Sequence, residues 1–154
     1  MNNNPFILKI INEEDYKIYY FETKIDEKTG KLYEPKINDV HIWTIMTENF
    51  FANCKKMNTK FAFVFNLHNL KTVPPLIILD VCKFFIENKE ILKNLLISNC
   101  IIMNNDNVRG FIDLYLKFYI PIKPIKLCKD IEDSKIFINH CFNNDDIKYN
   151  EVIY

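Results

Sequence analysis

The chain has 154 residues, and 49% of them are hydrophobic, which suits a single domain with a core of its own. Its formal net charge is zero, so no overall field draws it to nucleic acid or to an anionic membrane. No apolar run reaches the roughly 18 residues of a membrane span, and the start lacks a signal-peptide pattern. We therefore expect a soluble, cytoplasmic protein with no nucleic-acid partner and no membrane span.

The first part of the chain predicts a β-hairpin. Residues 6–11 and 16–23 are short runs rich in β-branched and aromatic side chains, and a polar stretch separates them. Residues 1–5, which precede the hairpin, are expected to be a disordered lead.

A helix and a buried strand follow the hairpin. Apolar side chains recur at helical spacing over residues 40–57, with Asn38 or Asp39 placed to cap the start. Residues 61–65, FAFVF, form an apolar run too short for a helix, and such a run is typical of a strand buried on both faces. We expect this strand to be central in the sheet and sandwiched between helices.

A polar loop and a second helix come next. Pro74 and Pro75 prevent helix formation before residue 75, where a missing N–H costs nothing. Helical spacing then continues to residue 88, and residues 89–94 form at most a further turn. A strand, a polar loop and a helix in this order are half of a βαβ unit.

Two more strand–helix units complete the pattern. Strands are predicted over residues 97–103 and 125–128, and each is followed by a helix, the last capped by Asp130. The order ββαβαβαβα predicts a single-domain α/β sandwich over residues 6–142, with a mixed, mostly parallel sheet of about five strands and about four helices. Residues 143–154 are expected to be a flexible tail.

The five cysteines have no metal-ligand spacing, and their number is odd. Each falls in a different predicted element, on or near an apolar stripe, at Cys54, Cys82, Cys100, Cys128 and Cys141. This pattern favours free, buried thiols in a reducing compartment over a metal site or disulfides. We expect no metal and no cofactor.

Residues 61–138 resemble the STAS or anti-sigma-factor-antagonist family, which has a SpoIIAA-like fold. The similarity is carried by FVFNLHNL at the central strand, PPLIILDVCKFF in the next helix, IIM followed by VRGFIDLYLKFY, and KPIKLCKDIEDSKIFI near the end. The resemblance implies a non-enzymatic regulatory domain that docks against another protein. Separately, a homo-oligomer is a possible assembly of the chain. The docking surface would be the loop and helix after the central strand, from Asn66 to Leu79.

The chain departs from this family at one functional turn. Bacterial members place an aspartate at the end of the central strand and a phosphorylated serine in the following turn. Here Asn66 stands at the aspartate position and VPPL replaces the serine turn, while the only serines, Ser98 and Ser134, lie elsewhere. We expect the phosphoserine switch to be absent.

Polar side chains gather in the loop after the central strand, where α/β proteins bind ligands. They could contact a partner, or they could satisfy backbone groups within a turn. Thr72 could also be phosphorylated near the start of the helix, or be an unmodified surface residue. The predicted partner-binding set joins this loop to the start of the helix and comprises Asn66, His68, Asn69, Thr72, Pro74, Pro75 and Ile78.

Arg109 is the only arginine, and it falls in the first turn of the third predicted helix. A guanidinium beside helix N–H groups could bind phosphate or carboxylate. The alternative is an ion pair with Asp106 or Asp113.

Two other classes of protein remain open. CRAL-TRIO lipid-transfer domains share the same broad fold, so a small-ligand or lipid-binding domain with an enclosed apolar pocket is the alternative to protein docking. A hydrolase would need Asn66, His68 and Asp80 to converge. Because no nucleophile motif or glycine-rich phosphate loop occurs, we expect no catalytic site.

Overall fold

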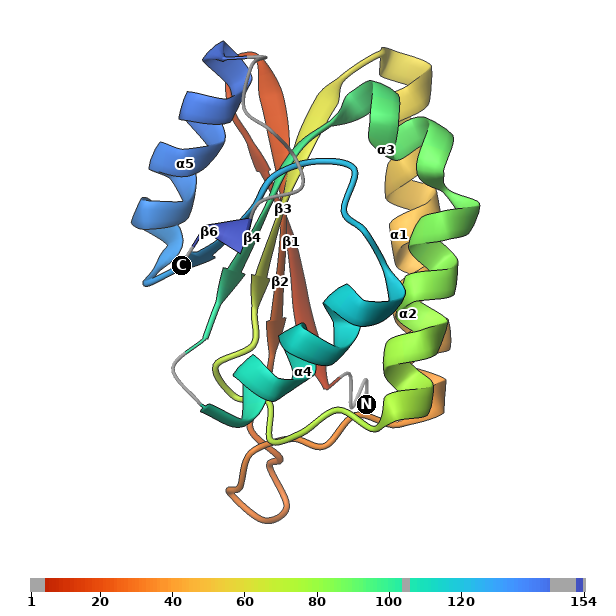
Figure 1. Ribbon diagram of the computed structural model, residues 1–154, viewed down its shortest axis with the longest axis vertical. Helices are drawn as coiled ribbons and strands as arrows, with labels where there is room; N and C mark the ends of the chain where they lie inside the picture. The colour runs from red at the N-terminus through yellow and green to blue at the C-terminus, as the bar shows by residue number, and fades with distance from the viewer. Residues whose placement is uncertain (1–4, 104–105, 145–151, 154) are drawn as a thin grey trace.

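The computed structural model describes residues 5–103, 106–144 and 152–153, which form a six-stranded sheet covered by five helices (Figure 1). The strands are β1 Phe6–Asn12, β2 Tyr16–Thr23, β3 Lys60–Asn66, β4 Leu96–Ile102, β5 Ile125–Cys128 and β6 Val152–Ile153. The helices are α1 Ile37–Met57, α2 Pro75–Glu87, α3 Lys89–Leu95, α4 Asp106–Phe118 and α5 Ile131–Asn143.

The strands cross the sheet in chain order, from β1 at one edge to β6 at the other. β1 and β2 pair antiparallel as the predicted hairpin, and each later pair of neighbours is parallel. The prediction of a single α/β domain with a mixed, mostly parallel sheet is therefore confirmed. β6 has only two residues and falls within the predicted tail, of which residues 145–151 and 154 lie outside the described residues.

Two helix boundaries differ from the prediction. α1 begins at Ile37 rather than near residue 40. Asp39 is the third residue of the helix and not the N-cap residue that precedes it. Its carboxylate lies in the first turn and accepts the N–H of Lys36, with 2.7 Å between the atoms. The predicted turn after α2 is a separate helix, α3, because the chain breaks at Asn88, whose side chain donates to the carbonyl of Phe84 at 2.8 Å.

β3 occupies the middle of the sheet, as predicted. Its residues Phe61, Ala62, Phe63 and Val64 have no exposed surface. Phe61 and Phe63 pack into an aromatic core under α1, α2 and α3. Ala62 and Val64 face α5, which covers the opposite side of the sheet (Figure 1). The alternation of side chains along a strand places one apolar set on each face.

A short polar chain crosses the aromatic core. The hydroxyl of Tyr19 lies 2.7 Å from the hydroxyl of Thr47, which donates to the carbonyl of Trp43, also at 2.7 Å. Because both hydroxyls are bonded, the core accommodates them without the penalty of an unpaired buried group.

All five cysteines are free and buried, as the sequence predicts. Burial raises the pKa of Cys82 and of Cys141 to about 11. In the described part of the chain, no three histidine, cysteine or acidic side chains gather closely enough to hold a metal ion. None of the helices described combines the length and the hydropathy that crossing a bilayer requires.

Candidate functional site

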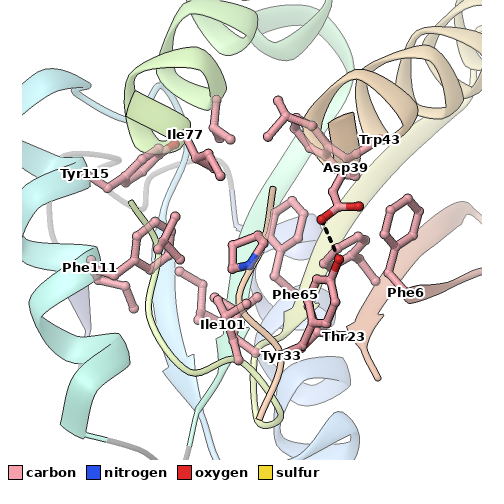
Figure 2. Close-up of a pocket in the computed structure, with 18 of the residues that line it drawn as sticks. Phe6, Thr23, Tyr33, Asp39, Trp43, Phe65, Ile77, Ile101, Phe111 and Tyr115 are labelled. Atoms are coloured by element: carbon pink, nitrogen blue, oxygen red, sulfur yellow. Dashed lines mark hydrogen bonds between the residues drawn. The ribbon is translucent and has the colours of Figure 1, made fainter. Parts of the chain in front are cut away.

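A pocket of about 150 Å³ lies at the carboxyl ends of the central strands, and we call it the strand-end pocket. Phe21, Phe65 and Ile101 line it from β2, β3 and β4. The helices on that face contribute Trp43 from α1, Ile77, Val81 and Phe85 from α2, and Phe111, Ile112 and Tyr115 from α4. Figure 2 shows Phe111 and Tyr115 on one side of the pocket and Phe6 on the other. The lining is therefore almost wholly apolar.

Two connecting segments run together beside the pocket. The segment between β2 and α1 meets the segment between β3 and α2 in a parallel bridge from Tyr33 to Leu70. The N–H of Tyr33 donates to the carbonyl of Asn69 at 2.8 Å, and the N–H of Lys71 donates to the carbonyl of Tyr33 at 2.9 Å. Pro35, from the first segment, also lines the pocket. Backbone hydrogen bonds thus hold both segments in place.

An ionisable pair lies in the pocket lining. The phenol of Tyr33 donates to Oδ2 of Asp39, with 2.7 Å between the oxygens (Figure 2). Partial burial, and then the Asp39 carboxylate, raise the pKa of Tyr33 above its ordinary value of 10.0. The pair therefore places a hydrogen-bonded carboxylate against an apolar space.

Thr23 and Asn99 are the other polar residues of the lining. Thr23 is 5% exposed, and its hydroxyl, which has almost no accessible surface of its own, has no hydrogen-bond partner among the described residues. Figure 2 places Thr23 on the same side of the pocket as Tyr33 and Asp39. A buried hydroxyl without a partner is uncommon in a folded protein and calls for an explanation.

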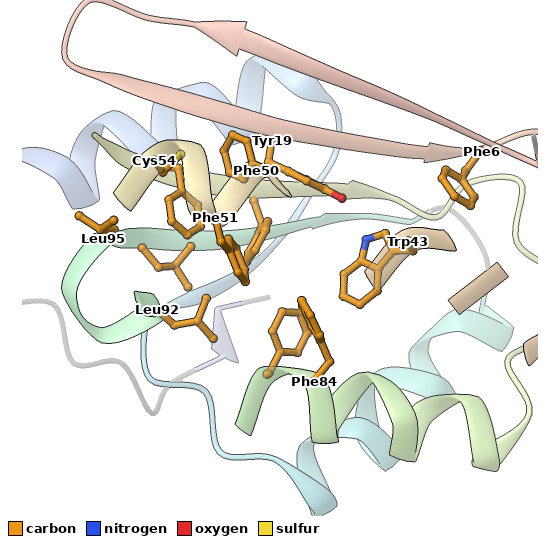
Figure 3. Packing of buried hydrophobic residues seen from close by; sticks show 13 residues of the cluster. Phe6, Tyr19, Trp43, Phe50, Phe51, Cys54, Phe84, Leu92 and Leu95 are labelled. Carbon is orange, nitrogen blue, oxygen red and sulfur yellow. The ribbon is translucent and has the colours of Figure 1, made fainter. Parts of the chain in front are cut away.

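The wall on the helix side is built from packed aromatic rings. Trp43 makes an edge contact with Phe84 at 5.0 Å between ring centroids, and Figure 3 shows it between Phe84 and Phe6. Phe85 makes a similar edge contact with Tyr115 at 6.3 Å. Such contacts restrict ring motion, so the pocket is bounded by a fixed surface on this side.

Two asparagines of the predicted loop site have structural roles. The side chain of Asn66 donates to the Tyr20 hydroxyl at 2.9 Å and accepts the N–H of His68 at 3.1 Å. The side chain of Asn69 donates to the carbonyl of Thr23 at 3.1 Å. These bonds match the alternative in which the loop satisfies its own backbone and the neighbouring strand.

The rest of the predicted set divides between surface and core. His68, Thr72 and Pro75 are exposed, and Pro74 is half-buried. Ile78 is 1% exposed, so including it in a partner-binding surface was wrong. It lies one helical turn before Cys82 on the face of α2 that packs inward.

Arg109 is exposed in the first turn of α4 and does not line the strand-end pocket. Its predicted role as an anion contact stays a prediction. Asn66, His68 and Asp80, the trio that a hydrolase would need, also lie outside the pocket lining.

The site predicted from the sequence did not include the residues that line the pocket. Leu67, Leu70 and Val73 from the predicted loop reach it, whereas their polar neighbours do not. The recurrence of an apolar residue at every third position of this loop is the signal that could have identified them. Thr23 and Tyr33 carry no such signal, because their importance depends on segments distant in the sequence.

No known protein family, curated protein or solved structure matches the chain. The likeness to STAS domains therefore remains a proposal.

Proposed function

We propose that the protein is a non-enzymatic binding module that holds a small apolar ligand in the strand-end pocket. The observation that carries this proposal is an apolar pocket of about 150 Å³ at the carboxyl ends of parallel strands. This end of an α/β sheet is where such folds bind ligands, and apolar pockets with a few polar groups are typical binding sites.

The volume favours a small ligand over a lipid. Pockets for drug-sized ligands occupy about 300–1,000 Å³, whereas an apolar cavity of about 150 Å³ in another protein accommodates benzene. A CRAL-TRIO-like domain could bind a small molecule or a lipid, and the volume of the pocket favours the small molecule. A monocyclic hydrocarbon such as toluene is a suitable probe.

Toluene binding can be measured by calorimetry and by the rise in melting temperature, because a ligand that binds only the folded state stabilises it. Ile77→Phe should fill part of the pocket and weaken binding about tenfold or more. Ile86→Phe, on the exposed face of the same helix, is the matched control and should bind as the wild type does. Failure of the wild type to bind toluene, or equal binding by Ile77→Phe, would overturn the proposal.

Protein docking through α2 is a second candidate function. Leu76, Leu79 and Ile86 are 67%, 41% and 51% exposed, and their spacing puts them along one outer face of the helix. This stripe begins within residues 66–79, the region that a STAS-like regulatory module would use. Exposed apolar stripes of this kind support protein contacts.

The first partner to test is a second copy of the chain. Sedimentation equilibrium over a range of concentrations should show self-association that Leu76→Lys combined with Leu79→Lys abolishes. Ile136→Lys, a change of the same kind on the exposed side of α5, should leave it intact. A monomer at every concentration would rule out the homo-oligomer.

The five buried, free thiols support a cytoplasmic location for either function.

A further inference from the structure

We infer that the ligand of the strand-end pocket is a cation, a protonated amine carried on a small apolar body. This inference rests on the proposed function and adds the charge of the ligand. It is carried by one carboxylate, that of Asp39, in a lining that is otherwise uncharged and rich in aromatic rings.

The formal charge of the pocket lining is negative. Among the described residues that form it, Asp39 is the one acidic residue, and no lysine, arginine or histidine occurs. Neither of the two ion pairs found among the described residues includes Asp39. The N–H groups in the first turn of α1 offset part of the carboxylate charge, because a helix start favours an anion. The remainder attracts a cationic ligand and repels an anionic one.

A second carboxylate adds to the negative field on this side of the pocket. Partial burial, then Asp39 and then Asp26 raise the pKa of Tyr33, which therefore stays a neutral phenol. The side chain of Asn99 can both donate and accept a hydrogen bond, so it opposes neither sign of charge. The charged groups around the pocket thus favour a positive ligand.

Aromatic rings give the pocket a second preference for a cation. Eight of its described lining residues are aromatic, and the faces of such rings carry partial negative charge. Trp43 follows Asp39 by four residues on α1, so the indole and the carboxylate lie on the same face of that helix (Figure 2). Tryptophan is the strongest cation–π partner among the side chains. An ammonium group at Asp39 would therefore lie beside the indole as well.

The partial exposure of Tyr33 and Asp39 suits a charged ligand. Moving an ammonium group completely out of water is costly. Because both side chains are half-buried, the ammonium group can keep part of its water while the apolar body enters the pocket. The same exposure screens the attraction to Asp39, so the gain in affinity over a neutral ligand of equal shape is modest.

The test compares benzylammonium, benzyl alcohol and benzoate, which share one ring and differ in charge, by calorimetry at neutral pH. The wild type should bind benzylammonium about fivefold more tightly than benzyl alcohol, and benzoate more weakly than either. Higher salt should weaken the binding of benzylammonium and leave that of benzyl alcohol unchanged. Trp43 is the only tryptophan in the chain, so a change in its fluorescence shows that a probe binds at this pocket.

Two variants separate the charge of Asp39 from its other roles. Asp39→Asn removes the charge and keeps a side-chain oxygen for the N–H of Lys36. It should bind benzylammonium no more tightly than benzyl alcohol, and should bind benzyl alcohol as the wild type does. Asp80→Asn, at an exposed position of α2 outside the lining, is the matched control and should retain the preference for the cation.

The outcomes distinguish this inference from the function on which it rests. If toluene and benzyl alcohol bind but the wild type does not prefer benzylammonium, or if Asp39→Asn keeps that preference, the inference is overturned while the apolar pocket stands. If none of these probes binds, the proposed function fails and the inference with it. Urea unfolding shows whether each variant is folded. Should Asp39→Asn not fold, the preference of the wild type and its salt dependence decide the inference.

Discussion

Tyr33 and Asp39 join two parts of the chain at the strand-end pocket, through a hydrogen bond of 2.7 Å between the phenol and the carboxylate. Tyr33 belongs to the segment that pairs with the loop after β3, and Asp39 lies in the first turn of α1. Because Asp39 also accepts the N–H of Lys36, one carboxylate both caps the helix and fixes the segment beside the pocket.

Removal of this bond should destabilise the fold by a measurable amount. We expect Tyr33→Phe to lower the free energy of unfolding by about 1 kcal/mol, because a partly exposed bond to a charged acceptor is lost. A double-mutant cycle with Asp39→Ala, measured in urea, separates this bond from the capping role of Asp39. A coupling energy of zero would show that the bond contributes nothing to stability.

Thr23→Val should have the opposite effect on stability. The substitution replaces a buried, unpartnered hydroxyl with a methyl group of similar size, so we expect the free energy of unfolding to rise by about 1 kcal/mol. Thr23→Ser, which retains the hydroxyl, should not gain this stability. A drop in the urea midpoint of Thr23→Val would mean that the hydroxyl is paired in solution.

The sheet and its central strand could be predicted because their signals are local. Residues 61–65 are apolar without interruption, and that pattern is enough to indicate a strand covered on both faces. Pro75 marks the start of α2 and Asp130 the start of α5 for equally local reasons. The predicted start of α1 was wrong because an aspartate can stabilise a helix start either as the N-cap residue before the helix or as the third residue within it. The sequence does not distinguish these two positions.

The pocket could not be predicted in the same way. Thr23 lies at the end of a strand in which β-branched residues are expected, and only the packing of distant segments leaves its hydroxyl unpaired. Ile78 shows the converse error. Its helical spacing already placed it on the inner face, but its closeness in sequence to the Pro-Pro turn led to its inclusion in a surface. Neighbours along a helix lie on different faces.

Tyr19 should make the protein sensitive to alkaline pH. Burial raises the pKa of Tyr19 above its ordinary value of 10.0, so above pH 10 the unfolded state loses the tyrosine proton first. The stability that this group contributes is therefore complete below pH 10 and is lost as the pH rises further. We expect the urea midpoint of the wild type to fall more steeply above pH 10 than that of Tyr19→Phe, in which Thr47 keeps its bond to Trp43. Identical slopes would contradict this assignment.

Phe63 should be among the most sensitive positions of the core. It is fully buried in β3 and makes an edge contact with Tyr19 at 5.3 Å between ring centroids. We expect Phe63→Ala to lower the free energy of unfolding by about 3–5 kcal/mol, through lost burial and the cavity that remains. Phe118→Ala, at an exposed position at the end of α4, is the matched control and should change it by less than about 1 kcal/mol. Equal losses from the two variants would mean that β3 is not central to the core.

The start of α5 provides a test of local structure that is independent of the pocket. Asp130 accepts the N–H of Asp133, in the first turn, at 2.8 Å, and Asp133 accepts the N–H of Lys129, just before the helix, at 3.0 Å, so both N–H groups are satisfied. We expect Asp130→Ala to lower the free energy of unfolding by about 1 kcal/mol, because Ala cannot accept the bond, and Asp130→Asn to retain most of that stability. Because α5 packs on this face of the sheet against β3, β4 and β5, the loss should appear in global urea unfolding and not only as fraying of the helix end. Hydrogen exchange that accelerates only in the first turn of α5, with an unchanged urea midpoint, would show instead that this turn opens independently of the domain.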